Sequence, residues 1–538
     1  MAIYVTGAPL HMTDHPLWKE VFSTLRPSYQ PPTRKKIATT ILDAEFEDMQ
    51  AIVTSTVAEA ENLNLQCDGW SNVRNEGILN FVITTPKPVF VDFINTKENR
   101  HTHNYLSGEI KKILEKHDVK KFFSIIGDNA RNMQKAFEDV HNEYPHLIPL
   151  GCLCHTLHLL CGDIIKCTSV ATFFAAVGNI VKTITKSQTL SAIFSRIKNE
   201  NNCTTSLKHP CKTRWGSYLQ SLQSLLKCKA TLQAFAVSET ATNILPRETR
   251  TSLLDEDIFW VRIQKMADLL TPIVKWISKL ESDEPLIHKT YFAFSEIEDE
   301  LKTVLPTSPV TKAEEQIILK EFRNRKTHAL KAIHYAAALL DPERQGDLLS
   351  QEEQLEAVEF IDTVAGNMQL NDTVVMAEVA GYRTKSTGIW GKPFLWKSVE
   401  RLSPIIWWKG MCGSSELSKV AVRILSCPTS SAATERSFST FGFIHNKRRN
   451  RLTTERAGKI TYIAHNWRKL NKDSSASDQS IRLSTVSTES TREKSADRSK
   501  NLPAEDFSDT DSDSTMSGRT HDSTDDEITN SEISDSDN

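Results

Sequence analysis

Two aspartates, Asp68 and Asp128, each follow a short strand-like run and could together hold metal ions. Asp68 comes directly after 62–67, and Asp128 comes after 122–126 and one glycine. If these runs are neighbouring strands of one sheet, their carboxyl ends lie side by side. An aspartate after a strand also commonly caps a turn or a helix, so either residue alone would be weak evidence. The pair therefore predicts a metal site, which a third carboxylate from a nearby helix would complete.

Carboxylate oxygens in this arrangement suit phosphodiester chemistry. Two divalent ions about 3.5–4 Å apart can hold the attacking and leaving oxygens of an in-line displacement. Mg²⁺ prefers oxygen ligands and keeps several waters, so few protein carboxylates are needed. We therefore expect two Mg²⁺ or Mn²⁺ ions as cofactors. Periodicity does not select the third acid among the many glutamates of the chain.

The elements around the two aspartates predict an α/β fold. Strand-like runs at 62–67, 78–84 and 89–95 are followed by helix 105–117, strand 122–126, helix 131–141 and strand 147–154. Consecutive strands this close usually pair antiparallel, and later strand–helix units usually add parallel neighbours. The order predicts a ribonuclease-H-like mixed five-stranded sheet.

The rest of the chain is mostly helical in pattern and suggests five parts. We expect an N-terminal arm (1–45), the first part of the core (46–215), an all-α insertion (216–400), the C-terminal part of the core (401–470) and a Ser/Asp-rich tail (471–538). Within the insertion, single helices are expected at 218–235, 258–280, 290–304, 313–339 and 354–364. The tail has few apolar residues and is expected to be disordered.

Composition excludes several classes of protein. The 538 residues are 39% hydrophobic and 25% charged, as in ordinary globular proteins. Ten cysteines over this length do not form a disulfide framework. The longest apolar run, 170–181, is too short for a membrane span. Residues 503–538 carry a net charge of −11 within a total of −3, which leaves +8 on the body and favours a nucleic-acid partner.

Several separated blocks resemble hAT-family (hobo/Ac/Tam3-like) DNA transposases over roughly residues 20–470. The matching blocks, in chain order, are 67–71, 127–133, 152–155, 213–217, 335–344, 404–408 and 431–439. The resemblance implies that Glu435 is the third acid, separated from Asp128 by the helical insertion. It implies the catalytic and metal-binding set Asp68, Asp128 and Glu435, and a C-terminal dimerisation region.

Four further residues are expected to contact DNA. Trp70 lies two positions after the first acid, where its ring could stack on an extruded base; a core or sheet-edge tryptophan is the alternative. Arg214 and Trp215 belong to the block 213–217, and Arg214 could instead form a helix-start salt bridge. His155 could contact DNA, or bind zinc with Cys152, but the spacing is not a standard finger and a buried structural cluster is the better explanation.

The resemblance implies a transposase that cuts transposon ends, through a hairpin on the flanking DNA, and joins them to a target. Residues 1–60 contain no Cys/His pairs with zinc-finger spacing, so we expect a copy without the end-recognition finger. The alternatives are a transposase-derived nuclear protein that dimerises and binds DNA without catalysis, and an inert remnant. Whether the chain is an enzyme is therefore left open. The basic run 447–451 suggests a nuclear signal or a phosphate contact, and the nucleus is the expected location.

Self-association is expected through residues 404–470. This stretch carries many aromatic side chains, which are Trp407, Trp408, Phe438, Phe441 and Phe443. Their apolar face exceeds what one helix hides alone, which favours a homodimer or a higher oligomer. Burial of the same face against the chain's own sheet is the competing explanation. No membrane contact and no small-molecule substrate are expected.

Overall fold

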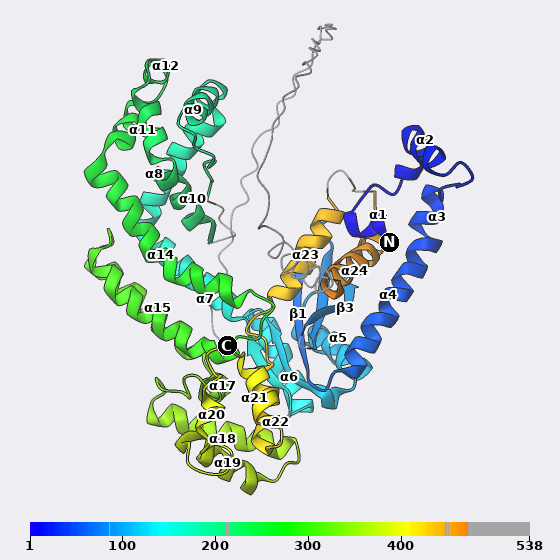
Figure 1. Ribbon diagram of the computed structural model, residues 1–538. Helices are drawn as coiled ribbons and strands as arrows, with labels where there is room; N and C mark the ends of the chain where they lie inside the picture. Colours follow the sequence, from blue (N-terminus) through cyan, green and yellow to red (C-terminus); the bar gives the residue numbers. More distant parts are fainter. Residues whose placement is uncertain (86, 211–215, 447–448, 450, 472–538) are drawn as a thin grey trace, which may run out of the picture. The chain divides into compact units, whose positions relative to one another are not determined.

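A computed structural model describes residues 1–85, 87–210, 216–446, 449 and 451–471 (Figure 1). Except for Asn471, the predicted tail (471–538) lies outside these ranges. Within the described residues no single helix is long and apolar enough to cross a membrane. One consecutive pair, Leu153–Lys166 and Thr168–Lys186, passes that length and composition test only jointly, and it is bent by 88°.

The centre of the fold is one mixed sheet of five strands. The strands are β1 (Leu63–Ser71), β2 (Gly77–Thr84), β3 (Pro88–Asn95), β4 (Phe122–Gly127) and β5 (Ile148–Gly151). Their spatial order is β3-β2-β1-β4-β5. β1 pairs antiparallel with β2 and parallel with β4, β2 pairs antiparallel with β3, and β4 pairs parallel with β5. The predicted ribonuclease-H-like α/β architecture is confirmed.

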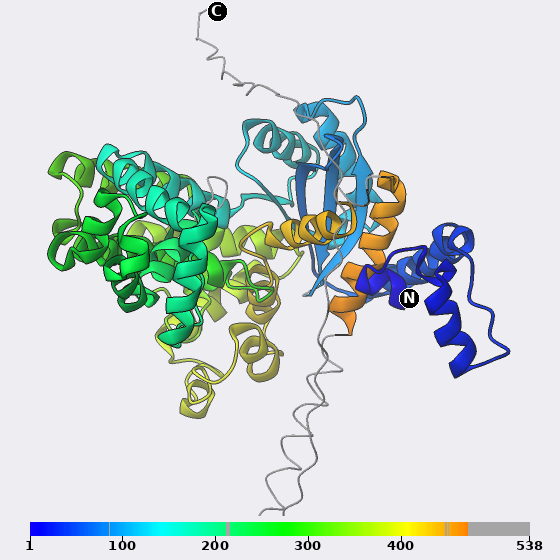
Figure 2. The same cartoon turned by 90° about the horizontal axis from the view of Figure 1, so that it is seen from above.

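Helices from both ends of the chain cover this sheet. They are α4 (Thr40–Glu59), α5 (His103–Lys116), α6 (Arg131–Glu143), α23 (Ala432–Ile444) and α24 (Thr454–Leu470). α5 packs on α6, whereas α24 packs on α4 and β3, and α23 packs on β1 and β2. Figure 2 shows α24 between the sheet and the N-terminal helices. The core is therefore completed by a segment that begins 281 residues after the end of β5.

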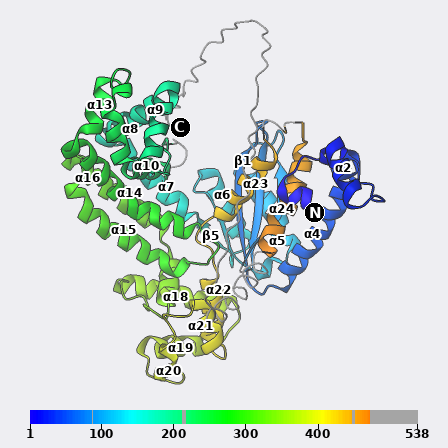
Figure 3. The same cartoon turned by 45° about the horizontal axis from the view of Figure 1, so that its top comes forward.

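A large helical body separates β5 from α23 in the sequence (Figure 3). Its helices are α7 (Leu153–Lys166), α8 (Thr168–Lys186), α9 (Gln188–Glu200), α10 (Gly216–Lys227), α11 (Lys229–Val237), α12 (Glu239–Thr242), α13 (Arg247–Leu254), α14 (Val261–Leu280), α15 (Thr290–Val304), α16 (Lys312–Ala329), α17 (Ala332–Leu339), α18 (Gln351–Asn367), α19 (Asp372–Thr384), α20 (Pro393–Trp396), α21 (Pro404–Met411) and α22 (Glu416–Leu425). Capping boxes start α16, through Thr311 and Glu314, and α18, through Ser350 and Glu353.

Aromatic contacts join the early and late helices of this body. Phe174 of α8 meets Tyr218 of α10 with ring centroids 4.8 Å apart, and Phe194 of α9 meets Phe235 of α11 at 5.6 Å.

Two predicted single helices are divided in the structure. The stretch 218–235 breaks at Cys228, and 313–339 breaks at Leu330, where the backbone is extended. Both residues are buried, so each break turns the next helix back onto the body.

The aromatic residues that motivated self-association are partly buried within the chain. Trp407 and Trp408 are completely buried among Tyr382, Trp390 and Trp396, and their indole N–H groups donate to backbone oxygens. Phe441 is completely buried against the sheet side of the fold. Phe441 therefore fits the competing explanation, whereas Trp407 and Trp408 are buried in the helical body and not against the sheet. Phe443 differs, because 59% of it is exposed.

The N-terminal arm contains several short helices before α4. They are α1 (Ala2–Thr6), a 3₁₀ turn (Met12–Asp14), α2 (Pro16–Leu25) and α3 (Arg34–Ala38). α1 packs on α24, where the Arg468 guanidinium donates to the Val5 carbonyl at 2.7 Å. The arm is thus attached to the C-terminal part of the core.

Candidate active site

Asp68 lies inside β1, on the strand at the centre of the sheet. The sequence predicts a strand that ends just before this residue. In the structure β1 continues to Ser71 because 69–71 pair with 77–79 of β2. Asp68 stands opposite Asn80, and its Oδ1 accepts the Gly69 N–H at 2.7 Å. Its carboxylate is half-buried, so it is held by the strand and remains accessible from one side.

Asp128 follows β4 directly, as predicted. β4 runs parallel to β1 with Gln66 opposite Ile126, so the two aspartates come from adjacent strands that point the same way. The Asp128 Oδ1 accepts the Ala130 N–H at 3.2 Å, which fixes the carboxylate at the turn into α6. A Cβ at Gly127 would come within 2.9 Å of the Cys67 carbonyl oxygen. A glycine here permits the close approach of the two strands.

Glu435 lies in the first turn of α23 and is exposed. The helix crosses the sheet at the level of Asp68, because the Asn80 amide donates to Ser437 Oγ at 2.7 Å. This bond joins Asn80, which stands opposite Asp68, to Ser437, which lies two positions after Glu435. Glu435 is therefore placed over the same end of the central strands as the two aspartates.

The pKa of Asp68 depends on burial and on the charges of the other two acids. Burial raises the pKa of this carboxyl well above its ordinary value, and the negative charges of Asp128 and Glu435 raise it further. The Gly69 N–H opposes the shift. Like charges that gather without a cation disfavour ionisation. Among the described residues, however, no group of three or more His, Cys, Asp or Glu side chains is close enough to hold a metal ion.

The carboxylate donor set fits hard divalent cations such as Mg²⁺ and Mn²⁺. A bound cation would also offset the charge repulsion that raises the pKa of Asp68. The ligand atoms are therefore of the type that two such ions prefer. To coordinate the ions together, the three carboxylates would have to move closer to one another.

Cys152 connects the Asp128 side of the site to the helix that carries Glu435. Its Sγ accepts the backbone N–H groups of His155 and Ser431, each at 3.4 Å. The first bond caps α7, and the second holds the residue that precedes α23. The Leu153 N–H donates to the Thr429 carbonyl at 3.1 Å, which reinforces the same junction. The block 152–155 therefore forms the buried structural cluster expected beside the acids.

His155 is half-buried at the start of α7. Burial lowers its pKa, although the nearby Asp128 charge partly opposes that shift. The imidazole is therefore neutral at neutral pH and lies within electrostatic range of the second acid. Its predicted contact with DNA stays a prediction.

Trp70 lies between the sheet and α23. Its ring stacks on Phe438 at a centroid distance of 5.4 Å and meets Phe441 edge-on at 5.2 Å. The indole Nε1 is buried and has no hydrogen-bond partner in the described part of the chain. The residue therefore packs the acid-bearing helix onto β1, while its partly exposed ring stays the predicted DNA contact.

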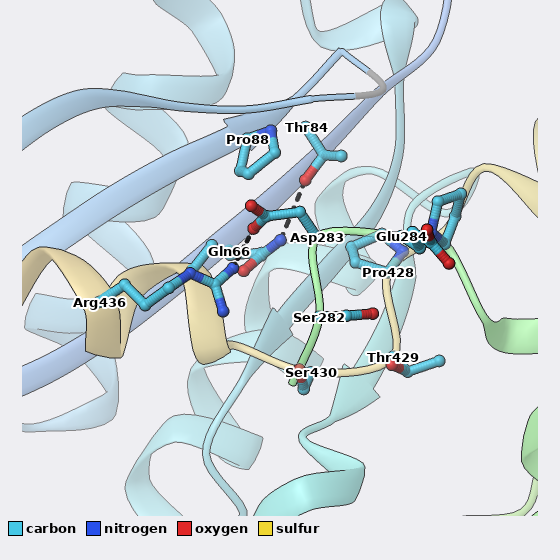
Figure 4. Close-up of a pocket in the computed structure, with 12 residues that line it drawn as sticks. Gln66, Thr84, Pro88, Ser282, Asp283, Glu284, Pro428, Thr429, Ser430 and Arg436 are labelled. Atoms are coloured by element: carbon cyan, nitrogen blue, oxygen red, sulfur yellow. Dashed lines mark hydrogen bonds and ion pairs between the residues drawn. The ribbon is translucent and has the colours of Figure 1, made fainter. Parts of the chain in front are cut away.

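A loop of the helical body that contains Asp283 also anchors α23, the helix that carries Glu435 (Figure 4). Arg436, next to Glu435, pairs with Asp283 and donates to the Glu281 carbonyl at 2.5 Å. Lys469 of α24 pairs with the same aspartate. Sequence reasoning missed Asp283 because nothing in its local pattern distinguishes it from other surface acids.

The remaining predicted contacts fall on parts of the chain that the structure does not describe. Arg214 and Trp215 lie outside the described residues, as do Lys447, Arg448 and Asn450 of the basic run. The DNA contacts predicted for Arg214 and Trp215, and the nuclear signal or phosphate contact predicted for the basic run, stay predictions. Of the predicted site residues, the structure places five around one end of the sheet, which are Asp68, Trp70, Asp128, His155 and Glu435.

Comparison with known families gives two matches, each of which covers part of the sheet core and part of the helical body. Residues 32–185 match a domain of unknown function (DUF659), and residues 390–467 match the hAT family C-terminal dimerisation region. The second match supports self-association of the chain. No curated protein matches the sequence. The first match contains Asp68 and Asp128 and the second contains Glu435, and together the two matches support an hAT-family transposase or a protein derived from one.

Proposed function

We propose that this chain cleaves DNA and transfers the cut strands by metal-dependent nucleotidyl transfer. The observation that carries the proposal is that the Asp68 carboxyl, whose pKa burial raises, also lies within electrostatic range of Asp128 and Glu435, whose charges raise it further. These three residues come from two adjacent strands and a helix that is 304 residues further along the chain than Asp128. Strongly perturbed carboxyls that converge from distant segments are typical of functional sites.

Asp68, Asp128 and Glu435 would hold two Mg²⁺ or Mn²⁺ ions, which when bound lower the pKa of an attacking water or 3′-hydroxyl and stabilise the leaving oxygen. The protein's own groups orient these acids. The Gly69 and Ala130 N–H groups each hold one aspartate oxygen. Asn80, through Ser437, holds the helix that carries Glu435. Trp70, His155, Arg214 and Trp215 are proposed to contact the DNA.

A second candidate is a nuclear protein that dimerises and binds DNA without catalysis. It is favoured by one observation, which is that no three acids in the described residues are already close enough to hold a metal ion. Both candidates place the protein in the nucleus, with DNA and a second copy of itself as partners.

Nicking of supercoiled plasmid in Mg²⁺ or Mn²⁺ separates the two candidates. We expect the wild type to nick and the variants Asp68→Asn, Asp128→Asn and Glu435→Gln to lose this activity. Asp347→Asn is the matched control, since it removes an exposed, ion-paired carboxylate far from the acids in the sequence. DNA binding without any nicking by the wild type would support the second candidate. Nicking retained by all three acid variants would remove the site assignment.

A further inference from the structure

Two cysteines outside the candidate active site form a close pair. Cys203 follows α9, and Cys228 lies between α10 and α11. Their Sγ atoms are 3.5 Å apart, and both thiols are free. A disulfide requires about 2.05 Å between sulfurs, which side-chain rotation can approach from this separation. The Cys228 thiol also donates to the Thr205 carbonyl at 3.5 Å, which keeps it beside Cys203.

The two thiols differ in acidity. Burial alone would raise the pKa of Cys203, but hydrogen bonds at the Thr205 backbone and at Cys228 outweigh it, and the Lys198 charge helps, so the pKa is lowered. Burial raises the pKa of Cys228 to about 12, and its hydrogen bond to Cys203 adds to the shift. The thiolate is the reactive form of cysteine. Cys203 is therefore the thiol that reacts first, as the nucleophile, and Cys228 is the thiol that reacts second.

Exposure singles out the same residue. Of the nine cysteines in the described residues, eight are buried and Cys203 is half-exposed. Oxidation by small oxidants follows thiolate character and access to solvent. A hydroperoxide would consequently meet Cys203 before any other described thiol.

We propose that Cys203 and Cys228 form a redox modification site that closes a reversible disulfide on exposure to a hydroperoxide. The Cys203 thiolate attacks the peroxide oxygen, which gives a sulfenic acid at Cys203 and releases an alcohol or water. The Cys228 sulfur then attacks the Cys203 sulfur, the S–S bond forms, and the hydroxyl leaves as water with the Cys228 proton. Two thiols are oxidised and one peroxide is reduced. A dithiol reductant reverses the step by exchange.

The ring that this bond closes contains positions 204–227. Arg214 and Trp215, the residues that the sequence predicts to contact DNA, fall within it. Oxidation would therefore constrain the stretch of chain that carries them. The inference does not depend on catalysis, since it concerns thiols that lie in the helical body.

Peptide mapping of the full chain without reduction tests the proposal. After treatment with a small excess of hydrogen peroxide and blocking of free thiols, we expect a cross-linked peptide pair containing Cys203 and Cys228 that dithiothreitol abolishes. Cys203→Ser should remove the cross-link. Cys228→Ser should leave a sulfenic acid at Cys203 that a dimedone probe labels.

Two further variants keep the result interpretable. Cys412→Ser, at a buried thiol elsewhere in the helical body, should leave the cross-link unchanged. Cys211→Ser should also leave it unchanged, although that residue lies within the ring. A dominant disulfide through Cys211, or labelling of a buried cysteine ahead of Cys203, would overturn the proposal. Plasmid nicking is measured separately, so failure of the proposed catalysis would not affect this result.

Discussion

Replacing Asp68 by asparagine should stabilise the fold when no divalent metal is present. Burial and the charges of Asp128 and Glu435 raise the pKa of Asp68, so its ionised form costs free energy in the folded chain. Asparagine removes the charge and keeps an oxygen that can accept the Gly69 N–H. Each unit by which the folded pKa exceeds the unfolded one corresponds to about 1.4 kcal/mol, so we expect the free energy of unfolding to rise at neutral pH. The melting temperature should rise by a few °C, roughly 2–4 °C per kcal/mol for large domains.

The sign of the pH dependence follows from the direction of the shift. A carboxyl whose pKa is raised in the folded state binds more protons there than in the unfolded chain. Its contribution is favourable below the unfolded value of 3.8 and is lost as pH rises through the folded value. The advantage of Asp68→Asn over the wild type should therefore be small in acid and grow toward neutral pH.

A bound divalent metal should reverse the order of stability of the wild type and Asp68→Asn. A cation that binds only the folded chain stabilises it by RT ln(1 + [L]/Kd). Wild type should thus gain melting temperature on addition of Mn²⁺, and Asp68→Asn should gain little. Differential scanning fluorimetry in EDTA and in Mn²⁺ measures both effects, with Asp347→Asn as control. An asparagine variant that is less stable than wild type in EDTA at neutral pH would refute the electrostatic reasoning.

Two other predictions concern the supports of the site, and a third concerns His288, a buried residue of the helical body. Gly127→Ala should cost about 1–3 kcal/mol, because its Cβ would meet Phe137 and the Cys67 carbonyl; thermal melting against Gly108→Ala, whose Cβ meets no atom within 4 Å, measures this. Arg436→Gln should lower the nicking rate by releasing the turn that carries Glu435, but should change stability by less than about 1 kcal/mol, since the ion pair with Asp283 is exposed; equal losses in an Arg344→Gln control would contradict it. Burial lowers the pKa of His288 from 6.5 to about 3, so the stability that its neutral form contributes is present above pH 6.5 and is lost as pH falls toward 3. His288→Gln should remove up to about 1.4 kcal/mol per pH unit of that loss in chemical denaturation.

The positions of Asp68 and Asp128 were predictable because strand ends leave local signals. Short apolar runs and the glycine before Asp128 located β1 and β4, and the order of elements predicted that they are neighbours. The continuation of β1 through 69–71 was not predictable from that stretch alone. Gly69 and Ser71 have low strand propensity, and this stretch forms a strand because 77–79 of β2 supply hydrogen-bond partners.

Glu435 and its anchors required information from outside the local pattern. A glutamate in a helix first turn is common, and only the family resemblance selected this one. The partner of the neighbouring Arg436 is Asp283, 153 residues earlier. The partner of the Asn80 amide is Ser437, 357 residues later. Such pairings depend on how the helical body and the sheet meet, so no periodicity in the sequence contains them.

The segment matched to the hAT dimerisation region serves two separate cores of this chain. Its first helices, α21 and α22, place Trp407, Trp408 and Leu417 in the core of the helical body, whereas α23 and α24 place Phe441 and Tyr462 against the sheet. These side chains are buried within one copy and are not available to another. Large apolar groups that remain outward in this segment are Phe394, Ile406, Phe443 and Trp467, with exposures of 62%, 57%, 59% and 38%. Most aromatic side chains of this segment hold the acid-bearing helix and the helical body in place. The segment therefore does not need to form an aromatic interface with a second copy of the chain. Self-association has to use the smaller outward set, or surfaces of the chain beyond this segment.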